Sequence, residues 1–370
     1  MKAPDGFSPE RTRNKIKAFW FGRAALRLLS LVYLAGVFLR KALYGARILR
    51  RRRLGVPVVC FGNISAGGTG KTSTVVSAAR ALARAGRRPA ILIRGYKRRA
   101  PSAKVTVMVR GRDFDPREAG DEALMLYRML EADNVPVLVS SDRFSSGTVA
   151  VQELGADLLL MDDGYQYFAL ERDADILLVN AAAPFMEDSA LPFGNLREPV
   201  SAVTRASAVI LSHCGQAGPA ALDALRAEIN RLNPRAEIYE SNHVPEFFVD
   251  PVTARTTPLD ALKGRQASAL SGIGDPASFE AILAGLEIDL KQIWRYPDHH
   301  AFTPTELNSA RQAAGDLPVI TTYKDFVRFP TGWQEMLGSG LLILSIQVTF
   351  RGDGWAKLLK FISGFKKDGA

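Results

Sequence analysis

The chain has 370 residues, enough for two domains of ordinary size. Hydrophobic residues make up 47% and charged residues 23%, a balance that excludes a disordered chain or a fibrous repeat. Two cysteines, Cys60 and Cys214, lie in apolar, strand-like runs, which excludes a disulfide-stapled scaffold and favours a reducing compartment. The two cysteines and the four histidines do not form a two-Cys, two-His cluster in the sequence, which excludes a structural zinc site of that kind.

The excess positive charge is concentrated at the start of the chain. Residues 1–53 carry 14 Lys or Arg and 2 Asp or Glu, which leaves 34 of the 48 basic and 36 of the 38 acidic residues for 54–370. The formal net charge of +10 therefore comes from the N-terminal arm. We expect a basic arm before a near-neutral body, which excludes a generally basic nucleic-acid-binding protein.

Within this arm, residues 19–39 predict an amphipathic helix. Arg23, Arg27 and Ser30 interrupt an otherwise apolar segment at i, i+4 and i+7, so they form one narrow polar stripe. The longest stretch without a charged residue, 28–39, has 12 residues, fewer than the ~20 that cross a bilayer. The basic run 50–53 follows it instead of a signal-peptide cleavage site. We favour a helix that dips into one leaflet, with its basic flanks on anionic lipid head groups.

Two other interpretations of the arm are weaker. The helix could pack on the protein's own core and be followed by a solvated basic turn, although a core helix rarely needs so many basic neighbours. A nucleic-acid-binding arm is disfavoured because its apolar half would have no purpose. We therefore expect a membrane surface, and no nucleic acid, as the partner of this segment.

A strand, a glycine-rich loop and a helix follow the arm. Residues 56–61 form an apolar, β-branched run typical of a buried parallel strand, and a helical pattern covers 73–85. The intervening Ser-Ala-Gly-Gly-Thr-Gly-Lys-Thr indicates a phosphate-binding P-loop, although Ser65 stands where the usual pattern has Gly. Lys71 would reach the β- and γ-phosphates of ATP, and the Thr72 hydroxyl would hold Mg²⁺. The expected nucleotide-binding residues are Ser65, Ala66, Gly67, Gly68, Thr69, Gly70, Lys71 and Thr72.

The acidic half of such a site is predicted at the end of a second strand. Residues 158–161 are apolar and lead directly into Asp162 and Asp163. Either carboxylate can bind the metal ion of a P-loop nucleotide site. The expected fold class is α/β, a P-loop NTPase-like, doubly wound parallel sheet.

Further short motifs are weak one by one but specific as an ordered set. They are Arg94-Gly95-Tyr96, Gly120-Asp121-Glu122, Asp162-Asp163-Gly164-Tyr165-Gln166, Leu191-Pro192, Leu196-Arg197-Glu198-Pro199, Gly272-Ile273-Gly274-Asp275-Pro276, Pro297-Asp298-His299-His300 and Thr322-Tyr323-Lys324-Asp325. Together with the P-loop, this series resembles the tetraacyldisaccharide 4′-kinases over residues 56–325. Tyr323 departs from the Glu of that family, whereas Ser65 fits it, because the family tolerates Ser or Thr there.

The resemblance implies transfer of the ATP γ-phosphoryl group to the 4′-hydroxyl of an acylated glucosamine disaccharide lipid, tetraacyldisaccharide 1-phosphate. This step of lipid A biosynthesis gives lipid IVA. By position, Asp121 looks like the base that takes the hydroxyl proton, with His299, or alternatively His300, as its partner. Arg197 would stabilise charge on the transferring phosphoryl group. Thr72 with Asp162 would hold Mg²⁺, and Asp163 is the alternative ligand.

The same resemblance bears on location. A lipid with several acyl chains stays in the bilayer, since each buried CH₂ contributes ~0.8 kcal/mol. We therefore expect a peripheral or monotopic protein at the cytoplasmic face of the inner membrane, and a monomer. A different class of function, a membrane-associated switch ATPase of the partitioning type, is the alternative. Its P-loop carries a signature lysine where this chain has Ala66.

We expect four segments along the chain. They are a membrane-associated arm over 1–53, a P-loop kinase domain over 54–235, an interdomain connection over 236–262 and a smaller C-terminal α/β domain over 263–370. Within the connection, residues 236–239 and 247–249 predict two short strands separated by turn residues. Apolar residues on one face of 355–365 predict a docked terminal helix.

Overall fold

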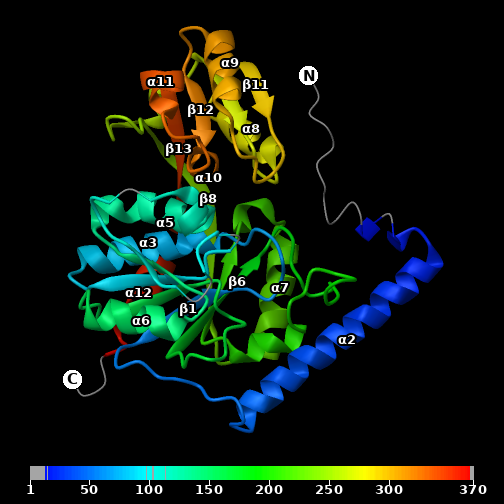
Figure 1. Cartoon of the computed structure of the whole chain (residues 1–370). Helices are drawn as coiled ribbons and strands as arrows, with labels where there is room; N and C mark the ends of the chain where they lie inside the picture. The colour runs from blue at the N-terminus through cyan, green and yellow to red at the C-terminus, as the bar shows by residue number, and fades with distance from the viewer. Residues whose placement is uncertain (1–12, 15, 97, 102–103, 113, 367–370) are drawn as a thin grey trace. The chain divides into compact units, whose positions relative to one another are not determined.

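The computed structural model describes residues 13–14, 16–96, 98–101, 104–112 and 114–366 (Figure 1). The described chain forms two compact units. The larger unit comprises residues 13–243 and 348–366, and the smaller unit comprises 244–347. Two long strands, β8 (Glu237–Val249) and β13 (Leu341–Phe350), run from one unit into the other along the chain.

The larger unit is built on a sheet with the strand order β8-β7-β6-β1-β5-β2-β4-β3. Neighbouring strands are parallel except at β3, which pairs antiparallel with β4 at the edge. Every residue of β1, β2, β5 and β7 is buried, as expected for parallel strands covered on both faces. The bounds are β1 (Val58–Gly62), β2 (Pro89–Ile93), β3 (Thr106–Met108), β4 (Val137–Val139), β5 (Leu158–Asp162), β6 (Ala174–Asn180) and β7 (Ala208–Ser212).

Helices cover this sheet and bury its apolar side chains in separate clusters. One cluster joins β6 and β7 to α7 through residues such as Leu177, Val209 and Leu225. Another joins β1, β2 and β5 to α6 through Cys60, Leu92 and others. The α/β class with a doubly wound parallel sheet is therefore confirmed. The helices are α3 (Lys71–Arg84), α4 (Pro116–Ala119), α5 (Asp121–Leu130), η1 (Glu131–Asp133), α6 (Arg143–Gln152), η2 (Val200–Arg205), η3 (Cys214–Gln216), α7 (Pro219–Leu232) and α12 (Gly354–Ser363).

Residues 348–366 belong to the larger unit rather than to a domain extending over 263–370. Leu358 and Ile362 of α12 are buried, and α12 packs against α3. The Arg87 guanidinium donates a hydrogen bond to the Ser363 carbonyl oxygen at 3.4 Å. The prediction of a docked terminal helix is thus confirmed, but the apolar face of this helix packs on the larger unit, which carries the P-loop.

The smaller unit has its own parallel sheet, in the order β11-β10-β12-β13, with β8 beside β13. Its core contains Phe248, Phe279, Ile320 and Leu344. This confirms the expected second α/β unit. Its remaining elements are β9 (Thr256–Thr257), η4 (Leu259–Leu262), β10 (Gln266–Ser271), α8 (Pro276–Gly285), β11 (Asp289–Arg295), α9 (Pro304–Ala314), β12 (Val319–Thr322), α10 (Tyr323–Phe326), α11 (Trp333–Leu337) and η5 (Gly338–Gly340).

Strand β8 corrects one sequence prediction. It is a continuous strand of 13 residues, where two short strands with a turn between them were expected. The residues that predicted the turn contact residues 213–215, outside β8, instead. The Asn242 side-chain oxygen accepts a hydrogen bond from the Gly215 amide at 2.6 Å, and the His243 ring stacks on His213 with centroids 4.5 Å apart.

The N-terminal helix α2 (Trp20–Gly45) is longer than the expected 19–39. At 1.5 Å per residue, its 26 residues extend about 39 Å. It is long and apolar enough to cross a membrane by length and composition, with 11% of its most apolar window buried. Leu26 and Ser30 are its buried residues, whereas Phe19 just before it and Trp20 are about 70% exposed. Exposed apolar surface on this scale is typical of contact with a partner or a membrane.

Acidification below pH 6.5 should destabilise the larger unit, because the fold keeps His243 neutral. Burial lowers the pKa of His243 to about 4; the charge of His213 acts in the same direction and the Gly70 backbone acts against both. An unfolded histidine, with a pKa near ~6.5, binds a proton more readily. The free energy of unfolding should therefore fall between pH 6.5 and 4, by about 3 kcal/mol at most.

Chemical denaturation at a series of pH values measures this effect. His243→Phe keeps a ring that can stack on His213 and removes the titrating group, so its unfolding free energy should depend less on pH over this range. His299→Phe in the smaller unit is the matched control and should leave the pH dependence of the larger unit unchanged. Identical profiles for wild type and His243→Phe would contradict the argument.

Candidate nucleotide and phosphoryl-transfer site

The P-loop lies between β1 and α3, as its spacing predicts. Gly70 precedes Lys71, the first residue of α3, and has a left-handed backbone with φ of 72°. A side chain at Gly70 could not fit, because its Cβ would lie 2.1 Å from Cε1 of His243. Gly67 also has positive φ, and Gly67 and Gly68 are exposed. The loop therefore presents backbone at the N-terminus of α3, where amide groups and the helix dipole favour phosphate.

The start of the P-loop is held by another segment, the bridging loop, defined here as residues 188–198. Ser65 forms an isolated bridge with Leu196. The Ala66 amide donates to the Asn195 carbonyl at 2.7 Å, and the Arg197 amide donates to the Ile64 carbonyl at 2.7 Å. The backbone of Ser65 and Ala66 is thus engaged with the bridging loop, while Gly67 and Gly68 form the exposed part of the bend and Lys71 begins the helix.

Asp162 lies beside the P-loop because β5 pairs in parallel with β1, and this pairing places Asp162 opposite Phe61. The Thr72 hydroxyl donates to Oδ2 of Asp162 at 3.3 Å, and Asp162 is buried. Among the described residues, none donates a hydrogen bond to its other oxygen, Oδ1. Burial, with the adjacent Asp163 charge, raises the pKa of Asp162 to about 7, although Lys71 acts to lower it. A buried carboxylate with an unpaired oxygen next to a hydroxyl suits a divalent cation.

Asp163 is engaged differently, since the chain turns at this residue with φ of 50°. The Arg197 guanidinium donates to its two carboxylate oxygens at 2.8 and 3.0 Å. The Lys71 ammonium lies 3.5 Å from its Oδ1. Burial acts to raise the pKa of Asp163, but Lys71 and Arg197 outweigh it and hold the pKa below its ordinary value. Three predicted site residues, Lys71, Asp163 and Arg197, therefore form one charged cluster.

The Gly120-Asp121-Glu122 motif begins α5, which packs against α3. Glu122 is close enough to Asp162 for its charge to help raise the Asp162 pKa. A Cβ at Gly120 would lie 3.3 Å from the Tyr96 carbonyl oxygen, so the Tyr96 loop is its neighbour. The structure thus groups two of the motifs beside the acidic pair, with Asp121 as the first residue of α5.

In the smaller unit, the remaining motifs meet at the ends of β10 and β12. The Gly272 amide donates to Asp325 Oδ1 at 2.9 Å, and Lys324 donates to Asp298 at 2.8 Å. His300 contacts Glu306 at 3.0 Å and its ring stacks on Tyr296. His299 has positive φ and contacts Arg328 through Nδ1 at 3.2 Å. The predicted pairing of Asp121 with His299 joins two units that are described separately, so it stays a prediction.

The sequence alone assigned no role to a network of residues that connects the two segments carrying Asp163 and Arg197. Gln166 donates to the Asn63 carbonyl at 2.9 Å and to Glu198 at 3.0 Å. Glu198 is buried and accepts from Arg205 at 2.6 Å. Gln166 and Glu198 belong to two of the short motifs described above, so the sequence contained a reason to examine them. Arg205 belongs to none of these motifs. This network joins the segment after β5 to the bridging loop.

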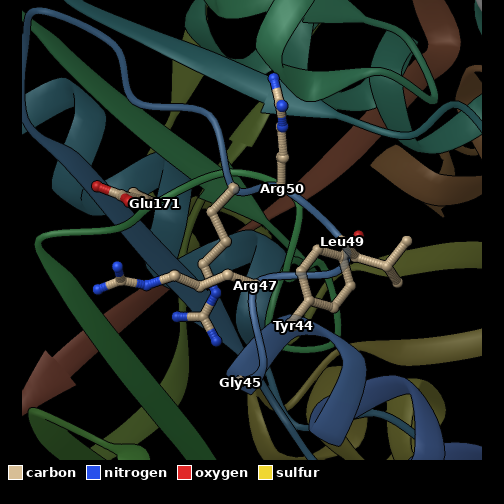
Figure 2. A pocket seen from close by; sticks show the side chains of 7 residues that line it. Tyr44, Gly45, Arg47, Leu49, Arg50 and Glu171 are labelled. Atoms are coloured by element: carbon tan, nitrogen blue, oxygen red, sulfur yellow. The ribbon is translucent and has the colours of Figure 1, made fainter.

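Two cavities border α2. One, of about 400 Å³, lies between the helix and the site; its lining includes Val32, Tyr33, Arg40, Gln166, Phe168 and Arg197. The other, of about 500 Å³, lies at the C-terminal end of the helix. Figure 2 shows it, lined by Tyr44, Arg47, Leu49, Arg50, Arg51 and Glu171. The first cavity is walled by the apolar helix and by Arg197, and the second is rich in arginine.

Comparisons with known proteins identify relatives of this chain. A family model described as "Tetraacyldisaccharide-1-P 4'-kinase" matches residues 22–363. A relative from Elusimicrobium minutum named "Tetraacyldisaccharide 4'-kinase" is 40% identical over 349 residues, covering 93% of this chain and 92% of its own. A relative of the same name from Anaeromyxobacter dehalogenans is 40% identical over 326 residues, covering 87% and 85%.

A solved structure is also similar over most of the chain. It is the "apo" form of LpxK from Aquifex aeolicus in complex with ATP. The TM-score is 0.73 and the sequence identity 28%, with 92% of this chain and 98% of that chain covered. These matches confirm the resemblance inferred from the ordered motifs: the chain belongs to the tetraacyldisaccharide-1-phosphate 4′-kinase family.

Proposed function

We propose that this protein transfers the γ-phosphoryl group of ATP to the 4′-hydroxyl of tetraacyldisaccharide 1-phosphate, which gives lipid IVA in lipid A biosynthesis. The observation that carries the proposal is the cluster of Lys71, Asp163 and Arg197 beside the Thr72–Asp162 pair. This cluster lies in a chain that matches the family over 22–363. The names of the relatives support the lipid acceptor, and the ATP in the Aquifex aeolicus structure supports the donor.

In the proposed reaction, the P-loop backbone and Lys71 bind the phosphates of ATP. Thr72 and Asp162 would hold Mg²⁺, which would neutralise charge on the β- and γ-phosphates. The unpaired Asp162 oxygen supports Asp162 as the ligand, whereas the carboxylate of Asp163 already accepts from Arg197. Asp163 then keeps Lys71 and Arg197 in place, and this is a positioning role rather than metal binding.

The acceptor side of the reaction depends on Asp121, Arg197 and His299. Asp121 would take the proton of the 4′-hydroxyl as it attacks the γ-phosphorus, and His299 would assist it from the smaller unit. Arg197, near Lys71 through their shared partner Asp163, would stabilise the negative charge on the transferring phosphoryl group. Positioning and charge neutralisation would supply most of the rate, with a smaller contribution from the base.

We further propose that the protein acts as a monomer on the cytoplasmic face of the inner membrane. The exposed apolar side chains of α2 support a helix buried in one leaflet. The arginine-rich cavity after the helix (Figure 2) offers Arg47, Arg50 and Arg51 to anionic head groups. A lipid acceptor held in the same leaflet would then meet the site without leaving the bilayer.

The direct test is transfer of label from γ-³²P-ATP to detergent-dispersed tetraacyldisaccharide 1-phosphate. Wild-type protein should produce a labelled lipid. Lys71→Ala should lower turnover at least ~100-fold, because it removes the cation that contacts the phosphates. Lys360→Ala, an exposed lysine on α12, is the matched control and should have no effect. Phosphate released to water without labelled lipid would favour the switch ATPase and contradict the proposal.

Asp121→Asn separates catalysis from binding. If Asp121 is the base, kcat should fall ~10²–10⁴-fold while the ATP dissociation constant changes less than about twofold. Turnover and equilibrium binding of a non-hydrolysable ATP analogue are the measurements. Glu118→Gln, which changes an exposed acid three residues earlier on α4, is the control. Equal losses of kcat and ATP affinity would show that Asp121 has a structural role instead.

The two carboxylates should respond differently to Mg²⁺. Asp162→Asn should abolish the increase in ATP-analogue affinity that Mg²⁺ produces and leave metal-free binding nearly unchanged. Asp163→Asn should weaken binding with and without Mg²⁺, because Lys71 and Arg197 lose their common anchor. Calorimetric titrations with Mg²⁺ or with EDTA measure both. The reverse pattern would assign the metal to Asp163.

A further inference from the structure

The bridging loop (188–198) connects the nucleotide site to the N-terminal helix. On one side it holds the first residues of the P-loop through Ala66 and Ile64, and it carries Arg197, which donates to Asp163. Its other side contacts α2. Any movement of this loop relative to α3 would therefore change where the Arg197 guanidinium meets Asp163.

Helix α2 holds the bridging loop through two hydroxyl groups. Ser30 Oγ accepts a hydrogen bond from the Phe193 amide at 3.0 Å. It also lies 3.0 Å from the Ala190 carbonyl oxygen, to which it can donate in place of its own helical Leu26 carbonyl. One turn further on, the Tyr33 hydroxyl donates to the Arg197 carbonyl oxygen at 2.9 Å. These contacts span 160 to 164 residues of sequence.

The position of these hydroxyls on the helix is informative. Ser30 belongs to the polar stripe that also contains Arg27, whose guanidinium lies 5.3 Å from the centre of the Phe193 ring. The stripe thus faces the bridging loop, while large apolar side chains such as Leu31 are exposed. A helix that served as an anchor alone would need no buried serine, and a core helix would bury its apolar face instead.

We propose that Ser30 and Tyr33 are positioning residues for phosphoryl transfer. By fixing the bridging loop to α2, they set the place of the Arg197 side chain against Asp163. The position of α2 therefore affects the position of Arg197 in the nucleotide site. In this proposal α2 has a role in catalysis in addition to bringing the protein to its lipid substrate. This inference rests on the proposed kinase function.

The experiment uses the full chain with ATP, tetraacyldisaccharide 1-phosphate and vesicles containing phosphatidylglycerol. Tyr33→Phe and Ser30→Ala should each lower kcat about fivefold to tenfold, the effect of one lost hydrogen bond on a group that acts in the transition state. Their cosedimentation with vesicles and their affinity for an ATP analogue should stay within twofold of wild type. Ser30→Thr keeps the hydroxyl and should restore most of the turnover.

Leu31→Ala is the matched control, because Leu31 lies on the same helix and is exposed. It should weaken vesicle binding and leave kcat in detergent solution unchanged. Tyr33→Phe made in an Arg197→Ala background should have almost no further effect on kcat, because Tyr33 would act through the side chain of Arg197. A merely structural role for Tyr33 would give the same loss in both backgrounds.

Several results would overturn the inference. They are unchanged kcat in Tyr33→Phe and Ser30→Ala, losses of kcat that follow losses of vesicle binding, or equal effects of Tyr33→Phe with and without Arg197. Hydrogen exchange over 189–198 gives a readout independent of turnover: Ser30→Ala should speed exchange at Phe193, and unchanged exchange would refute the coupling. If wild type labels no lipid, the proposed function fails; if it does and the variants match it, the inference alone fails.

Discussion

The site depends on the different partners of two adjacent carboxylates, Asp162 and Asp163. Asp162 ends a buried strand and faces the Thr72 hydroxyl, whereas Asp163, one residue later and turned by its positive φ, accepts from Arg197 and lies near Lys71. A buried carboxylate without a cation is costly in free energy. The fold pairs Asp163 with Arg197 and Lys71, whereas Asp162 has the Thr72 hydroxyl and the more distant charge of Lys71, and its pKa is raised to about 7. A cation held by Asp162 would balance that carboxylate, and this is the basis of the proposed metal site.

The second constraint is the path of the bridging loop between the P-loop and α2. In many P-loop proteins a glycine-rich turn is enough to bind phosphate, and here its first residues are also fixed by Asn195 and Leu196. The same loop is fixed by Ser30 on α2, a helix with several large exposed apolar side chains. Under the proposed function, a water-soluble nucleotide and a membrane-held acceptor must meet in one site, and this loop would link the P-loop physically to the helix proposed to contact the membrane.

Local signals were sufficient for the nucleotide half of the molecule. A strand, a glycine-rich turn and Lys71-Thr72 require no distant partner, and the apolar run before Asp162 places it at the same sheet edge. Contacts between distant segments were beyond the sequence pattern. The sequence shows the polar stripe of α2, but it does not show that Ser30 contacts Phe193. The residues near His243 are typical of a turn, yet they belong to a continuous strand, because their partners lie on η3 and on the residue before it. The proposed choice of Asp162 over Asp163 as the metal ligand depends on contacts that the sequence does not show, namely the Arg197 guanidinium on Asp163 and the unpaired Oδ1 of Asp162.

The measurement that tests the account most directly is a crystal structure of the full chain with Mg²⁺ and a non-hydrolysable ATP analogue. The account predicts a metal ion bound by the Thr72 hydroxyl and the Asp162 carboxylate, Lys71 and Arg197 on the terminal phosphate, and the Asp121 carboxylate facing that phosphate across the space for an acceptor hydroxyl. An Asp162 carboxylate with no metal on it, or an Asp121 directed away from the triphosphate, would contradict it.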